Sequence, residues 1–221
     1  NLKIFVPNAA NSIGVHFDNQ AVRGTVEYCE IVGNQSGACW GINIEDTPGC
    51  NVVHNEIHVV TLGIWMERNP LSFTDVFPGY VAYNHIYDFT ANDLQENDGI
   101  VVWAEGNFTG MLIEHNEIVG WQEDAIDIGG SFVIVQNNHC HDAGTAAGIS
   151  KAGIKMHHNL LGPIICRYNK IHGLPAAAAP PFSSDGIATK ENTNEIYYNL
   201  VYDIGLNAGD RGDGIVCQLN A

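Results

Sequence analysis

Apolar residues recur along the chain at fixed distances from two short motifs. The first motif is an Asn followed two residues later by an apolar residue: Asn55 and Ile57, Asn84 and Ile86, Asn116 and Ile118, Asn138 and Cys140, Asn169 and Ile171, Asn199 and Val201, with Cys29 and Ile31 as a variant. The second motif pairs Gly with the apolar residue after it, at Gly14, Gly41, Gly63, Gly99, Gly153, Gly186 and Gly214, with Ala125 as a variant. Successive copies of the first motif lie 22 to 32 residues apart. Such a period predicts a solenoid with one turn per repeat.

Aligning the repeats produces four apolar columns. Strand side chains alternate between two faces, so these alternate positions must all point inward. Equivalent residues then stack at about 4.8 Å from coil to coil. The columns are Val26, Val52, Val81, Ile113, Val135, Cys166 and Ile196; Ile31, Ile57, Ile86, Ile118, Cys140, Ile171 and Val201; Val15, Ile42, Ile64, Ile100, Ile126, Ile154, Ile187 and Ile215; and Phe17, Ile44, Met66, Val102, Ile128, Met156, Thr189 and Cys217. The pattern predicts an all-β parallel β-helix of about eight coils, forming a single domain over residues 1–221.

The Asn and Gly columns have separate physical reasons. Asn tolerates unusual backbone angles at a sharp corner, and stacked amides form hydrogen-bonded ladders. The Gly column marks another corner, where the backbone needs either a positive φ or a close approach.

These motifs, from about Gly14 to Cys217, resemble those of the pectate-lyase-like superfamily of right-handed parallel β-helices. The resemblance implies right-handed coiling and an extracellular or cell-surface location. It also implies carbohydrate binding or processing. The superfamily contains polysaccharide lyases, glycoside hydrolases, epimerases, phage tailspikes and adhesins, so the fold alone does not choose among these functions.

Composition and charge narrow the choice of partners. The net charge of -16 disfavours nucleic acid and anionic membranes as partners. The chain has no apolar run long enough to span a bilayer. The six Cys residues do not settle the compartment. Three of them, Cys140, Cys166 and Cys217, fall at core positions and Cys29 falls at the Asn position, so only Cys39 and Cys50 are candidates for a disulfide. Asn34 and Asn107 begin glycosylation sequons in expected loops, although such short motifs also arise by chance.

The strand after each Gly offers the best outward face for chemistry. Two residues after the Gly, the column expected to be exposed is His16, Asn43, Trp65, Val101, Asp127, Lys155, Ala188 and Val216; four residues after it, the column is Asp18, Glu45, Glu67, Trp103, Gly129, His157, Lys190 and Gln218. Trp65 and Trp103 would stack on sugar rings, and Glu67 and His157 would contact the same polysaccharide. Asp127 and Lys155 should form an ion pair between adjacent coils.

Two mechanisms stay open at this face. By resemblance to the superfamily lyases, Lys155 would abstract a proton from a uronate, assisted by Lys190 or Arg167. Asp124, Asp127 and Glu123 would then bind Ca²⁺, which prefers oxygen ligands. Alternatively, Asp127 and neighbouring carboxylates would catalyse hydrolysis. Mixed polar residues also occur on any exposed sheet, and Asp and Lys often pair for solubility alone.

Three further features are open to two interpretations each. The acidic column Asp98, Asp124, Asp185 and Asp213 is either a set of turn residues bonded to backbone amides or a set of Ca²⁺ ligands. His139, His141, His172 and Asp142 form either a Zn²⁺ site or an ordinary exposed cluster. The insertion from Leu174 to Ser184 either walls a substrate groove or forms a surface flap.

No capping helix is evident at either end of the predicted solenoid. The sequence is therefore either an excerpt of a longer protein or a subunit that stacks end to end. The alternative function is a non-catalytic filament or adhesin assembled in this way.

Overall fold

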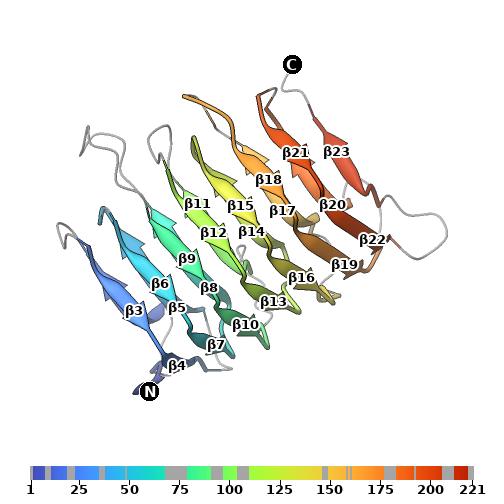
Figure 1. Ribbon diagram of the computed structural model, residues 1–221. Coiled ribbons are helices and arrows are strands. Elements are labelled where there is room, and N and C mark those ends of the chain that lie inside the picture. The colour runs from blue at the N-terminus through green and yellow to red at the C-terminus, as the bar shows by residue number, and fades with distance from the viewer. Residues whose placement is uncertain are drawn as a thin grey trace.

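The computed structural model describes residues 2–7, 11–18, 23–34, 38–47, 49–67, 79–90, 97–103, 110–145, 149–157, 159, 161–176, 183–191, 193–205 and 212–218. These residues form 23 strands in three parallel sheets, and no helix occurs among them (Figure 1). None of the described segments could therefore cross a membrane as a helix.

Each sheet takes every third strand of the chain. Sheet A comprises β1 (Leu2–Phe5), β4 (Cys29–Val32), β7 (Glu56–His58), β10 (His85–Tyr87), β13 (Glu117–Val119), β16 (His139–His141), β19 (Lys170–Leu174) and β22 (Leu200–Ile204). Sheet B comprises β2 (Ser12–Phe17), β5 (Cys39–Glu45), β8 (Leu62–Glu67), β11 (Ile100–Trp103), β14 (Asp124–Gly129), β17 (Lys151–His157), β20 (Ser184–Thr189) and β23 (Ile215–Cys217). Sheet C comprises β3 (Thr25–Glu27), β6 (Asn51–Val53), β9 (Tyr80–Ala82), β12 (Leu112–Glu114), β15 (Ile134–Gln136), β18 (Ile165–Arg167) and β21 (Glu195–Tyr197).

The predicted parallel solenoid is confirmed. The described chain completes the circuit through sheets A, B and C seven times and then adds β22 and β23, slightly fewer coils than the eight expected. Right-handed coiling stays a prediction, in line with the strong right-handed preference of parallel crossovers.

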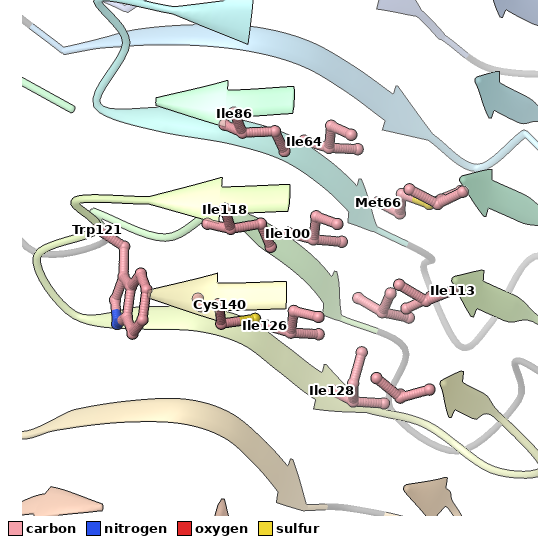
Figure 2. Packing of buried hydrophobic residues seen from close by; sticks show 14 of the residues in the cluster. Ile64, Met66, Ile86, Ile100, Ile113, Ile118, Trp121, Ile126, Ile128 and Cys140 are labelled. Atoms are coloured by element: carbon pink, nitrogen blue, oxygen red, sulfur yellow. The ribbon is translucent and has the colours of Figure 1, made fainter. Parts of the chain in front are cut away.

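All four apolar columns lie in the register that the sequence predicted. In sheet B, for example, Ile64, Ile100 and Ile126 are successive partners. Figure 2 shows these side chains stacked inside the coil, with Trp121 beside them as one of the largest fully buried residues. The core is continuous along the solenoid because equivalent residues of adjacent coils share the same environment.

The Asn ladder is confirmed, but the reason given for its corner was incomplete. Side-chain amides donate from coil to coil over 2.9 to 3.0 Å along Asn55, Asn84, Asn116, Asn138, Asn169 and Asn199. The left-handed backbone angle belongs to the residue before each of these positions and before Cys29, with φ between 53 and 57° at Tyr28, His54, Tyr83, His115, Asn137, Tyr168 and Tyr198. The Asn itself turns inward, where its amide satisfies buried backbone carbonyls.

Close approach, and not positive φ, explains the Gly column at every position except Gly214, where a Cβ would meet no described atom within 4 Å. A Cβ on Gly99 would lie 2.4 Å from the carbonyl oxygen of Ala125 and 2.7 Å from a methyl of Ile118. Ala125 is the one residue of this column with a side chain, and the sheet A strand that follows it carries Cys140 where most other coils carry Ile. The smaller Cys140 side chain is compatible with the added methyl of Ala125.

The disulfide considered between Cys39 and Cys50 is not formed, and all six cysteines are free thiols. Cys39 begins a strand of sheet B and points its sulfur at the carbonyl of Val59, at 3.4 Å. Cys50 precedes β6 of sheet C, so the two thiols belong to different sheets of one coil.

Replacing Asn116 by Ala should destabilise the fold by about 3 kcal/mol or more, because each buried group left unpaired costs roughly 1–3 kcal/mol. Its amide bonds the carbonyls of Val81 and Glu114 and the side chains of Asn84 and Asn138. Urea unfolding measures the change. Asn199→Ala is the matched control with a smaller expected loss, since the half-buried Asn199 lets water replace the missing bonds. Equal losses in the two variants would contradict a cooperative buried ladder.

Candidate active site

The outward columns of sheet B have the predicted register but not the predicted exposure. Trp65, Val101, Asp127 and Lys155 are successive partners across β8, β11, β14 and β17. The first three are nevertheless almost inaccessible to solvent. The column that was expected to be exposed is therefore covered over much of its length.

Trp65 belongs to a second, smaller apolar cluster on this outward face. It packs with Leu62 and Val101, and Trp40 stacks on it at 5.6 Å between ring centroids. Its indole nitrogen donates to Glu67 over 3.1 Å. With 9% of its surface exposed, Trp65 is not the open sugar platform that the sequence suggested. Trp103 is only partly buried at the edge of this cluster.

Asp127 is the centre of a charged network on the same face. The predicted ion pair is present, with the Lys155 ammonium 2.7 Å from Asp127. The same ammonium lies 2.8 Å from Asp124, and the ring of His157 contacts the other oxygen of Asp127 at 2.7 Å. The ring of Trp103 contacts that of His157 in a tilted arrangement, with 5.4 Å between the ring centroids. Strands β11, β14 and β17 thus bring these five side chains together.

The acidic column uses backbone amides where the structure describes its contacts. A carboxylate oxygen of Asp98 accepts from the amide of Asp124 at 2.7 Å, and Asp124 accepts from the amide of Ala152 at 2.8 Å. Each Asp therefore binds the backbone of the next coil, as expected for the turn-residue interpretation. Asp98, Asp124 and Asp185 are buried, whereas Asp213, before the last described strand, is exposed.

Burial separates the acidities of these carboxyl groups. It raises the pKa of Asp124 to about 7, although the charge of Lys155 opposes the shift. Burial, followed by the charges of Asp124 and Glu123, raises the pKa of Asp98 well above its ordinary value. Burial would also raise the pKa of Asp127, but the hydrogen bond from His157 and the charge of Lys155 bring it below the ordinary value. Two carboxyl groups on one ammonium therefore differ in protonation.

The pKa of Lys155 is raised. Burial alone would lower it, but the charges of Asp124 and then Asp127 outweigh that effect. Lys155 is therefore held as an ammonium ion, and it occupies the space between two of the three residues that were expected to bind Ca²⁺. Calcium binding by Glu123, Asp124 and Asp127 stays a prediction.

A pocket of about 190 Å³ opens beside Asp124. Its lining includes Glu123, Asp185 and three lysines, Lys151, Lys155 and Lys190. The chain has only nine Lys and Arg residues, so a third of them line this one hollow. Ser183, at the end of the insertion from Leu174 to Ser184, also lines it, whereas residues 177–182 lie outside the described chain.

Lys151 is the residue that the sequence interpretation missed. Its ammonium donates to the carbonyl of Gln122 at 2.6 Å, and burial lowers its pKa. Ala152 is the register partner of Asp124 in the acidic column. Lys151, one residue earlier, is therefore at the position that Glu123 occupies in the preceding coil. A search of that column for lysines as well as carboxylates would have identified Lys151.

Other candidate residues lie elsewhere. Arg167 is on sheet C, where it donates to Gln136 at 2.8 Å and to Tyr197 at 3.1 Å, so it cannot assist Lys155 on sheet B. The amide nitrogen of Asn34 donates to the carbonyl of Pro7 at 2.5 Å, a bond that a glycan would have to replace. Asn107 lies outside the described residues.

Comparison with protein-family models, with curated proteins and with solved structures found no match to this chain. The functional argument therefore rests on the geometry of the sheet B site.

The raised pKa of Asp124 predicts a fall in stability as the pH rises. The folded chain holds this proton more tightly than the unfolded chain, whose Asp titrates near 3.8. The resulting stabilisation is complete below that value and is lost as the pH rises through about 7. Urea unfolding at a series of pH values should show this decline, and Asp124→Asn should reduce its slope. The exposed Asp88→Asn is the matched control, and an equal slope change in it would contradict the assignment.

Proposed function

We propose that this chain binds an acidic polysaccharide in the pocket beside Asp124 and cleaves it by acid–base hydrolysis. The observation that carries the proposal is a buried carboxyl group, Asp124, that lines a pocket together with Glu123 and three lysines. Burial raises the pKa of Asp124 to about 7, which suits a proton donor. Lysines attract the carboxylates of a polymer such as a polyuronate, despite the acidic balance of the chain. The resemblance to pectate-lyase-like β-helices supports an extracellular carbohydrate substrate.

Each residue of the site has a distinct role in this proposal. Asp124, still largely protonated below neutral pH, donates a proton to the glycosidic oxygen that leaves. Glu123, which lines the same pocket, takes a proton from the attacking water. Asp127 stays ionised and positions Lys155 and His157, to which it is bonded. Lys190 contacts the anionic groups of the substrate.

Hydrolysis is preferred to β-elimination because of the state of Lys155. A general base must be free of its proton, whereas Lys155 lies 2.7 Å from the ionised Asp127 and 2.8 Å from Asp124, and its pKa is raised. Lys151 has a lowered pKa, but its ammonium is directed at a backbone carbonyl. Elimination also leaves an unsaturated sugar that absorbs ultraviolet light, so the products distinguish the two reactions.

Asp124→Asn should reduce the turnover of a polyuronate by about 100-fold or more, since general acid catalysis contributes roughly 10²–10⁴-fold. Release of reducing ends measures the rate, which should also fall in the original protein as the pH rises above 7. Asp88→Asn should retain full activity. Reducing ends without ultraviolet-absorbing products would support hydrolysis. Absorbing products, or an active Asp124→Asn variant, would contradict it.

End-to-end association of copies of this chain is the second candidate function. It is favoured by apolar residues that the last described coil exposes, with Leu200 57% and Ile215 51% accessible. Both lie on strands with one described neighbour each, and such edges can pair with another chain. Filaments that lengthen with concentration in electron micrographs would favour this function over catalysis.

A further inference from the structure

Three histidines gather on the outward face of sheet A, away from the sheet B pocket. His139 and His141 lie two residues apart on β16 and therefore share a face. His172 on β19 is the register partner of His141. The ring centroids lie 4.2 Å apart for His139 and His141, 5.3 Å for His141 and His172, and 5.2 Å for His139 and His172. Each ring is partly accessible to solvent.

The ring nitrogens of the three histidines lie close together. A nitrogen from each of the three rings lies within 4.8 Å of the other two. The Nε2 atoms of His139 and His172 are 3.0 Å apart. Two imidazole ligands of a tetrahedral zinc ion would be about 3.3 Å apart, given Zn–N bonds of about 2.0–2.1 Å. A small opening of this pair would therefore admit an ion in place of the hydrogen bond.

Neighbouring carboxylates orient the cluster and supply negative charge. Asp142 contacts Nδ1 of His141 at 2.9 Å, so Nε2 is the nitrogen of this ring that can bind an ion. A carboxylate beside the second nitrogen is the usual support of a metal-bound imidazole. Glu117 on β13 lies 3.2 Å from Nε2 of His141 and 3.8 Å from Nδ1 of His139.

Some charged groups around the cluster lower the pKa values of its histidines, and others raise them. Burial, His141 and Lys170 lower the pKa of His139. Burial, Lys170 and His141 lower that of His172, and the carboxylates of Asp142 and Asp203 oppose this shift. Lys170 also repels a cation, while Glu117, Asp142 and Asp203 attract one. Unprotonated imidazoles at neutral pH are the form that binds a metal.

We propose that His139, His141 and His172 bind a divalent transition-metal ion of the Zn²⁺ class. Imidazole nitrogens suit zinc, copper and nickel, whereas Ca²⁺ prefers oxygen ligands. The ion would link β16 to β19 and therefore join two adjacent coils. With three protein ligands, a fourth position stays open to solvent or to Glu117. The proposal does not depend on the hydrolysis assigned to sheet B.

Titration of the full chain with ZnCl₂, in competition with a chromophoric chelator, tests this site. The titration uses a Cys217→Ser background, because Cys217 is an exposed thiol that could bind zinc itself. We expect one saturable site at pH 7.5, with at least tenfold weaker binding in His141→Ala and in His172→Ala. Binding should also weaken as the pH falls, because protons compete with a metal ion for imidazole nitrogens.

His16→Ala is the matched control, because His16, Asp18 and Glu45 form the other group of potential ligands among the described residues. It should leave the affinity unchanged. Circular dichroism of the metal-free variants verifies that each one folds, and zinc should raise the melting temperature of every protein that retains the site. Absence of saturable binding, binding retained after loss of both His139 and His172, or binding lost in His16→Ala would overturn the proposal.

Discussion

In-register stacking of equivalent residues is the constraint on which the whole structure depends. After each circuit of the three sheets the chain lies directly beside its previous coil. The lateral neighbours of a residue are therefore the equivalent residues in the adjacent coils. Apolar counterparts form the continuous core, and amide counterparts bond one another along the Asn ladder. Stacking also forbids a side chain at most positions of the Gly column, where the next coil is too close.

In-register stacking also places charged residues of adjacent coils close together, where they can form binding or catalytic sites. Stacked carboxylates repel one another unless a donor or a cation compensates them. Asp98 and Asp124 accept backbone amides of the following coil, and Lys155 binds Asp124 and Asp127 together. The compensation is incomplete, so burial raises the pKa of Asp98 and of Asp124. On sheet A, stacking brings imidazoles from β16 and β19 into contact in the same way.

The strand register could be predicted from the sequence because the same residue types recur at the same position of each repeat. The Asn motif, the Gly motif and the Ile columns fix which residues are partners, including Asp127 with Lys155. Exposure could not be predicted from the column alone. Trp65 is covered because Trp40 and Leu62, from other positions, pack against it.

The reach of long side chains was the second limit of the sequence interpretation. The Lys155 side chain extends beyond its register partner Asp127 to Asp124, three residues earlier on β14. An alignment of the repeats does not reveal this contact, because the two residues occupy different columns. The left-handed corner was assigned to Asn, although the residue before it carries the positive φ. Propensity favours Asn in that conformation, but the ladder needs its amide inside the coil, so the preceding residue takes the strained position, and it is Tyr or His in every coil but that of Asn137.

The protonation of Asp124 is the central claim, and a ¹³C NMR titration of its carboxyl carbon tests it most directly. Assignment follows from the loss of one resonance in Asp124→Asn. The account predicts a midpoint near pH 7, because burial outweighs the charge of Lys155. A midpoint near the ordinary value of 3.8 would show that the ion pair dominates. It would leave the site without a proton donor at neutral pH and contradict the account.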